Sequence, residues 1–230
     1  MEVPAGSLRH HHLPGWRRTT PPEQRWQMSL AVLVAIGLEL VVPARLGLRP
    51  KWLLPALEAA FLVGLVAVNP GRIVRHSRQL RATTLMLVAA ISVANAASLV
   101  LLVRGLVNGT EGTHAGPLLI TGGAIWATNV IVFSFWYWEF DRGGPAARAH
   151  AHREHPDLLF PQMMSPEVAH EDWETKFFDY LYTSFTNATA FSPTDVMPLA
   201  RWAKLLFLAQ SSISLVAAAL IIARAVNILR

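Results

Sequence analysis

Apolar runs long enough to cross a bilayer alternate with short polar segments along most of the chain. A helix that crosses the hydrocarbon core needs about 20 residues and tolerates few charges. Five runs reach or approach this length, at residues 28–42, 52–69, 82–107, 117–138 and 199–229. The pattern predicts an all-α, polytopic transmembrane helix bundle, with a polar basic tail over 1–27 and three N-terminal transmembrane helices within 28–108.

The first apolar run has two interpretations. A basic stretch before an apolar core is also the layout of a signal peptide, but Pro43-Ala44-Arg45 is a poor small-residue cleavage site. The sequence Thr20-Pro21-Pro22-Glu23 is typical of a helix start, with a threonine cap, proline in the first turn and a glutamate at the capping-box position. We therefore expect an uncleaved first helix.

Residues 174–198 differ from these runs because their apolar positions recur at helical spacing, with hydroxyl and amide side chains between them. A half-polar helix beside an apolar span is typical of a re-entrant segment, since irregular backbone inside a bilayer survives only where it is buried in protein or lines water. A short helix that crosses fully is the alternative. The prediction is five spans plus a re-entrant or short sixth helix.

Composition agrees with a membrane protein and excludes several function classes. Charged residues make up 15% of the 230 and the mean hydropathy is +0.35, whereas soluble domains are about 25% charged. The absence of cysteine excludes disulfides, thiol nucleophiles and cysteine-ligated metals. The net charge of +5 does not indicate a nucleic-acid partner, because the basic residues lie between apolar runs. The expected partner is the lipid bilayer.

Four residues before the last span stand at the spacing of a known motif: Thr186, Thr189, Asp195 and Pro198. Here the chain resembles the pore domain of potassium channels, in which a pore helix ends in Thr-x-x-Thr and a Thr-Val-Gly-Tyr-Gly filter is followed by Asp-x-x-Pro. The resemblance implies a channel-like pore module over 109–230. Its parts are an outer helix at 117–138, a hydrophilic acidic and histidine-rich loop at 139–173, a pore-like helix and loop at 174–198 and an inner helix at 199–229.

The filter positions depart from that family. They read Ala190, Phe191, Ser192, Pro193 and Thr194, so both glycines are missing. A potassium filter uses glycine for backbone conformations that other residues resist, and proline fixes its own φ. The segment is expected to form a wider or different pore, or none, rather than a potassium-selective filter. The resemblance implies that these five filter residues line or brace the pore together with Thr186, Asn187, Thr189 and Asp195.

Three functions follow as hypotheses. The first is an ion channel that is not potassium-selective and passes monovalent cations as a homo-oligomer, a tetramer by resemblance, because one pore loop cannot enclose a conduit. The second is a non-conducting structural or accessory membrane protein. The third is a metal-binding membrane enzyme, which ranks last because no catalytic signature supports it. The chain also resembles bacterial inner-membrane proteins with this altered motif, which implies a multi-pass protein of that membrane.

Charge distribution and the channel resemblance conflict over topology. Nine of the fifteen acids lie within 139–179, where a channel would carry an extracellular turret. The positive-inside rule instead places the basic link with Arg72, Arg75, Arg78 and Arg81 in the cytoplasm. Two further spans then return the chain to the cytoplasm at Glu139. One solution is a fully crossing helix at 177–191, which gives six crossings and leaves both termini inside. The other is that the basic link lies outside, against its charge.

Glu39 and Glu58 lie within the first two apolar runs, where an acid is costly and is a candidate functional group. One interpretation is a proton or cation path. The other is a neutral or paired carboxyl that ties helices together, through Arg45 or Arg104. Asn129 is interpreted as an interhelical hydrogen-bonding residue.

Two further groups complete the candidates. His150, His152, Glu154 and His155 offer imidazole and carboxylate ligands that suit zinc or another divalent metal, although a hydrophilic loop explains them as well. No cofactor motif is present, and no cofactor is expected. The run Phe135-Trp136-Tyr137-Trp138 is interpreted as an aromatic belt at the headgroup level.

Overall fold

The computed structural model describes residues 14–47, 50–68, 78–111, 114–153, 155–190 and 195–229. Helices dominate it: α1 (Trp26–Val41), α2 (Leu53–Val68), α3 (Arg78–Val107), α4 (Ala115–Phe140), α5 (Pro145–Ala149), α6 (Pro161–Met164), α7 (Phe177–Ala190) and α8 (Arg201–Leu229). Two 3₁₀ turns, η1 (Gly15–Arg17) and η2 (Asp141–Gly143), and two short strands, β1 (Leu158–Leu159) and β2 (Met197–Pro198), complete the fold. The expected all-α class is confirmed.

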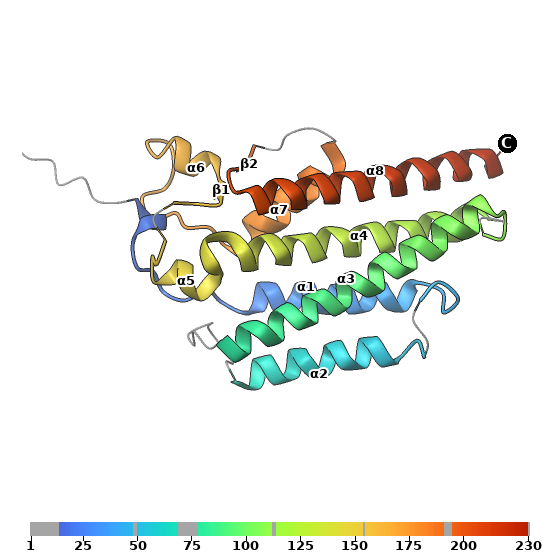
Figure 1. Cartoon of the computed structure of the whole chain (residues 1–230), viewed down its shortest axis with the longest axis horizontal. Helices are drawn as coiled ribbons and strands as arrows, with labels where there is room; N and C mark the ends of the chain where they lie inside the picture. The colour runs from blue at the N-terminus through green and yellow to red at the C-terminus, as the bar shows by residue number, and fades with distance from the viewer. Residues whose placement is uncertain are drawn as a thin grey trace, which may run out of the picture.

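Three helices are long and apolar enough to span a membrane, in the segments Gln79–Val107, Ala115–Gly143 and Arg201–Ile228. The protein is therefore a membrane protein by the length and composition of its helices. α1 and α2 are also apolar but have 16 residues each, which is about 24 Å of helix against a hydrocarbon core of about 30 Å. Figure 1 shows that α1, α2, α3, α4 and α8 all run roughly along the long dimension of the molecule.

α4 is the centre of the bundle and packs against α1, α3, α7 and α8. The other long helices present leucine and valine outward, as lipid-facing helices do: Leu33, Val63, Val93 and Leu205 are all more than half exposed. The expected aromatic belt is wrong for three of its four residues. Phe135, Tyr137 and Trp138 are at most 1% exposed. α4 lies at the centre of the bundle, so neighbouring elements cover the side chains of its last two turns.

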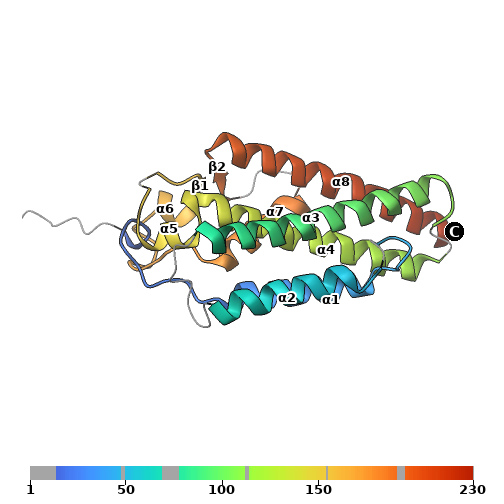
Figure 2. The same cartoon turned by 60° about the horizontal axis from the view of Figure 1, so that its bottom comes forward.

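One end of the bundle carries a folded cap, made of residues 14–25 and 141–176 together with the β1–β2 pair (Figures 1 and 2). The strands pair antiparallel, with Leu158 opposite Pro198. The segment expected to be a polar loop is thus ordered, and it buries Asp141, Arg142 and Arg148. The C-terminus lies at the opposite end of the bundle.

The N-terminal segment does not form the helix start that its sequence suggested. α1 begins at Trp26, and its N-cap residue Arg25 makes no capping hydrogen bond. Glu23 accepts hydrogen bonds from the Trp138 indole, at 2.8 Å, and from the backbone N–H of Phe177. The Glu23 carboxylate therefore bonds partners in α4 and α7 that are far away in the sequence, instead of the local backbone N–H of a capping box.

Candidate functional site

α7 is a two-faced helix held against α4 and α8. Its inner face carries Tyr180, Thr183, Ser184 and Asn187, each at most 4% exposed. Its outer face carries an apolar stripe, which we define as Phe178, Tyr182 and Phe185; these side chains are 47–66% exposed. The spacing of four and three residues places them on one side of the helix. α7 is therefore anchored within its own chain on one side. The stripe on its other side stays about half exposed, although Phe185 packs edge-on against the Trp126 ring of α4 and Tyr182 bonds Asp195.

The chain enters and leaves α7 at the same end of the bundle. The N–H of Phe177, the first residue of α7, binds Glu23 in the cap. After α7, Met197 pairs with Leu159 of the cap, and the N–H of Leu199 donates to the Asp157 carbonyl at 2.9 Å. α8 then starts at this end and runs antiparallel to α4 (Figure 1). α7 consequently does not carry the chain to the opposite end.

Gln210 of α8 is fully buried and connects three helices. Its Oε1 accepts from the Tyr137 hydroxyl of α4 at 2.7 Å and from the Asn187 amide of α7 at 2.9 Å. Its Nε2 donates to the hydroxyl and carbonyl oxygens of Ser184, at 2.7 and 3.0 Å. Every polar atom of the Gln210 side chain is thus used, which is what stabilises a polar group inside an apolar bundle.

Asn187 and Ser184 complete this polar network. The Asn187 amide also donates to the Phe207 carbonyl at 3.2 Å, and its Oδ1 accepts from Ser211 at 3.0 Å. Ser184 donates to the Val130 carbonyl of α4 at 2.6 Å. The resemblance placed Asn187 among the residues that line or brace a pore; its side chain is 4% exposed and bonded within its own chain.

Asp141, directly after α4, fixes the start of α7. Its Oδ2 accepts from the Tyr180 hydroxyl at 2.6 Å, and its Oδ1 accepts from the N–H groups of Asp157 and Leu158 at 3.1 and 3.2 Å. Asp141 and Tyr180 are both 0% exposed. One buried carboxylate therefore ties α4, α7 and the strand that receives the returning chain.

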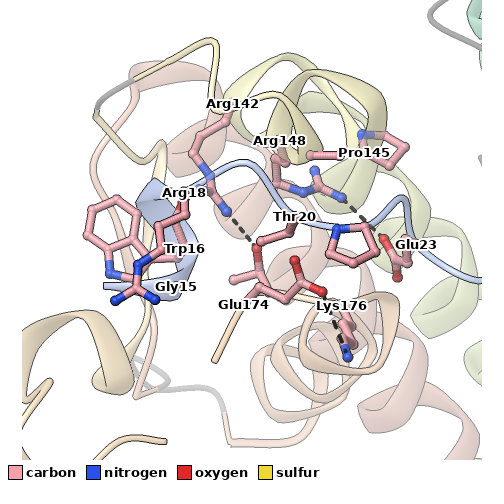
Figure 3. Close-up of a pocket in the computed structure, with 13 residues that line it drawn as sticks. Gly15, Trp16, Arg18, Thr20, Glu23, Arg142, Pro145, Arg148, Glu174 and Lys176 are labelled. Atoms are coloured by element: carbon pink, nitrogen blue, oxygen red, sulfur yellow. Dashed lines mark hydrogen bonds and ion pairs between the residues drawn. The ribbon is translucent and has the colours of Figure 1, made fainter. Parts of the chain in front are cut away.

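Two buried arginines, Arg142 and Arg148, contact Asp141 in the cap, and Figure 3 shows both of them lining a small pocket together with Glu23. Arg142 donates to the Trp16 carbonyl at 2.8 Å and to the Thr175 hydroxyl at 2.7 Å. Arg148 donates to the Asp141 carbonyl at 3.0 Å and pairs with Glu23 at 3.8 Å. Burial raises the pKa of Glu23 above its ordinary value, against the opposing effect of Arg148. The cavity between these groups is about 20 Å³, which is room for about one water.

The remaining pore-like residues fall at the far end of α7. Thr186 and Thr189 donate to carbonyls of their own helix, at 3.0 and 2.9 Å, and Thr189 is exposed. Asp195 is exposed and accepts from the Tyr182 hydroxyl at 3.2 Å. Ala190 is the last residue of α7. The filter positions at 191–194, which are Phe191, Ser192, Pro193 and Thr194, lie outside the described residues.

The intramembrane acids lie in the N-terminal helices, apart from α7. Glu39 lines a cavity of about 40 Å³ between α1, α2, α3 and α4, and Glu58 is fully buried beside it. The expected partner Arg45 instead binds Glu111, with a bond of 2.8 Å from Nη2 to Oε2. The pairing of these acids with Arg45 is therefore wrong.

The histidine group forms no metal site in the part of the chain that the structure describes, where no cluster of three or more metal-ligating side chains is found. The His150 Nδ1 lies 2.7 Å from the Ala146 carbonyl, and the rings of His150 and His152 are 5.4 Å apart. His155 is exposed, and Glu154 lies outside the described residues.

Sequence reasoning missed Gln210, Asp141, Tyr180 and the two cap arginines. A signal existed for Gln210, because an amide in the middle of an apolar span favours an interhelical hydrogen bond. The interhelical role expected of Asn129 is present: its amide donates to Ser214 of α8 at 3.3 Å. The cap residues had no local signal, because their partners lie up to 126 positions away in the sequence.

Comparison with known proteins adds no further assignment: no family model, no curated protein and no solved structure matches the chain.

Proposed function

We propose that the protein is a membrane-embedded, channel-like protein in which α4, α7 and α8 form a pore module with α7 as its re-entrant helix. The observation that carries the proposal is the return of the chain to the cap after α7. α7 has 14 residues, or about 21 Å of helix, which is too short to cross a core of about 30 Å. An antiparallel helix pair with a short helix entering and leaving between them is also the layout that the potassium-channel resemblance implies.

Conduction requires several copies of the chain, because one hairpin cannot surround a conduit. The half-exposed stripe of Phe178, Tyr182 and Phe185 is the surface of α7 that is proposed to meet another copy. Thr189 and Asp195 lie at the end of this exposed face and would supply hydroxyl and carboxylate oxygens to a cation. We propose a homo-oligomer, a tetramer by resemblance, that passes monovalent cations without potassium selectivity.

The cap end of the bundle is proposed to face the cytoplasm of a bacterial inner membrane. Arg81 donates to the Glu139 carbonyl at 3.1 Å and pairs with its carboxylate at 3.5 Å, so the start of α3 and the end of α4 lie at the same end of the bundle. The cap also contains Arg142 and Arg148, and the positive-inside rule favours the cytoplasm for such an end. The hairpin would then open inward, opposite to the pore loop of potassium channels.

A second candidate is a non-conducting accessory protein, and one observation favours it. The side chains of Ser184 and Asn187 hydrogen-bond to α4 and α8 of their own chain. A hairpin fixed in this way also serves as a packing element. Ion flux separates the two candidates.

The absence of native cysteine makes cross-linking a direct test of the oligomer. Phe185→Cys on the exposed face of α7 is compared with Val63→Cys, which is 67% exposed on α2. If the copies of the chain meet around a symmetry axis beside α7, the cysteines at position 185 of two copies lie close together. Oxidation should then cross-link the copies, because a disulfide requires close Cβ atoms. Cross-linking through residue 63 alone, or a strictly monomeric mass in detergent, contradicts the proposal.

Flux into liposomes that contain the purified protein tests conduction. The parent should pass a monovalent cation, and Asp195→Asn and Thr189→Ala should reduce the flux while leaving the protein folded, because both residues are exposed. Absence of flux for sodium, potassium and protons in the parent would favour the accessory function.

A further inference from the structure

A polar cavity lies between the N-terminal helices and α4, away from the α7 hairpin. It has a volume of about 40 Å³ and is lined by oxygen-bearing side chains from three helices: Glu39 of α1, Asn95 and Ser98 of α3, and Thr128 of α4. Its volume exceeds the roughly 15 Å³ that one water requires. A small ion with one water therefore fits, but neither a fully hydrated ion nor an organic ligand does.

Glu58 of α2 does not itself line this cavity, but its carboxyl group contacts that of Glu39, which does. The Glu58 side chain is 0% exposed, and apart from the Glu39 carboxyl group neither of its carboxylate oxygens has a hydrogen-bond partner among the described residues. The Oε1 of Glu39 is also buried without a partner there. A buried acid is normally paired or bonded, because an unpartnered one loses its solvation without compensation. Apart from a proton shared between the two carboxyl groups, the described residues therefore supply the pair with no hydrogen-bond donor.

The charge and size of the site select the ligand. Two adjacent carboxyl groups hold one proton between them more readily than none, which leaves a net charge of about −1. One monovalent cation or a second proton balances that charge. Carboxylate, amide and hydroxyl oxygens suit a hard cation, whereas calcium would need six to eight oxygen ligands and magnesium keeps several waters, for which the cavity lacks room.

We propose that Glu39 and Glu58 form a binding site for one small monovalent cation of the sodium class, which is taken up in exchange for a proton. The exchange balances: the carboxyl group releases a proton to solvent, and the cation takes its place on the carboxylate oxygens. Asn95, Ser98 and Thr128 supply neutral oxygen ligands. This inference does not rest on the pore proposed for α7.

Lys51 stands where this cavity meets the link between α1 and α2. It lines the cavity, and its ammonium donates to the Leu40 carbonyl at 2.7 Å. Apart from Glu39 and Glu58, it is the titratable residue that faces the site from the described elements around it; α3 and α4 contribute neutral residues. Its positive charge competes with a free cation, so Lys51→Gln should strengthen cation binding.

An apolar carbodiimide tests the site, because it modifies protonated carboxyl groups in apolar surroundings. Intact mass and peptide mapping of the purified full-length protein should find one modification, at Glu58. Sodium chloride should slow it relative to choline chloride at equal ionic strength, by about tenfold when sodium is about ten times its Kd, since occupancy removes the free carboxyl. Raising the pH should slow it as well.

Three variants separate the outcomes. Glu58→Gln should abolish the modification, and it should fold because it removes a buried charge. Asn95→Ala keeps both acids, so it should be modified normally while losing part of the protection by sodium. Ser212→Ala, an exposed change on α8 far from the cavity, should behave as the parent. Modification that sodium and choline affect equally, or no modification at Glu58, would overturn the proposal.

Discussion

Asn187 of α7 donates a hydrogen bond of 2.9 Å to Gln210 of α8, and both side chains are buried. Asn187, which the resemblance placed among the residues that line or brace a pore, therefore holds two helices of one chain together. Gln210→Leu removes the acceptor for Asn187 and Tyr137 and the donor to Ser184. We expect it to destabilise the protein by about 1–2 kcal/mol, the range measured for hydrogen bonds between membrane helices.

Thermal unfolding in detergent measures this loss, with Ser212→Ala on the exposed side of α8 as the matched control. A double-mutant cycle with Asn187→Ala should give coupling, because the two side chains contact each other. Strictly additive effects would contradict the network.

Asp141→Asn should be the most damaging single change in the cap. The carboxylate accepts from Tyr180 and two backbone N–H groups and lies 3.5 Å from Arg142. Its loss leaves buried positive charge uncompensated, which costs about 3–5 kcal/mol. Asp172→Asn is the control, because Asp172 is 81% exposed and only weakly paired. Equal unfolding temperatures for the two variants would refute the anchoring role of Asp141.

Gly15→Ala should loosen the N-terminal segment from the cap. A Cβ at this position would lie 2.8 Å from the backbone carbonyl carbon of Asp172 and 2.8 Å from the Trp173 carbonyl oxygen. Backbone atoms cannot move aside as a side chain does, so we expect a loss of about 1–3 kcal/mol and faster proteolysis before α1. Gly37→Ala in α1 meets no atom within 4 Å and should be neutral or slightly stabilising.

Labelling of single cysteines with a membrane-impermeant maleimide should report the topology. Gln79→Cys and His155→Cys, both at exposed positions, should be modified from one side of the membrane, because the Arg81–Glu139 contacts hold their segments together. Asn227→Cys near the end of α8 should be modified from the other side. Modification of all three from one side would mean that α7 crosses the membrane.

The Arg45–Glu111 pair predicts a pH dependence of stability. The Arg45 hydrogen bond holds the pKa of Glu111 below its ordinary value of 4.5. The stabilisation is therefore present above the unfolded-state pKa and is lost as the pH falls through the folded-state value. The parent should melt about 1–3 °C above Glu111→Gln near neutral pH, and the difference should vanish in acid. A difference that grows in acid would contradict the pairing.

The sequence by itself determined the helices. The apolar runs at 28–42, 52–69, 82–107, 117–138 and 199–229 match α1, α2, α3, α4 and α8 to within a few residues, and the half-polar stretch matches α7. These elements are readable because helix formation and membrane length depend on consecutive residues.

The tertiary structure alone decided how these helices are used. It buried Trp138 and Tyr137, paired Glu23 with the N–H of Phe177 instead of with a helix cap, and placed Glu58 against Glu39 with no hydrogen-bond donor among the described residues. It also returned the chain after α7 to the cap through the pairing of β2 with β1. These outcomes rest on contacts between residues far apart in sequence. Whether these side chains are buried or hydrogen-bonded depends on which helix faces pack together, and the local sequence pattern does not specify this packing.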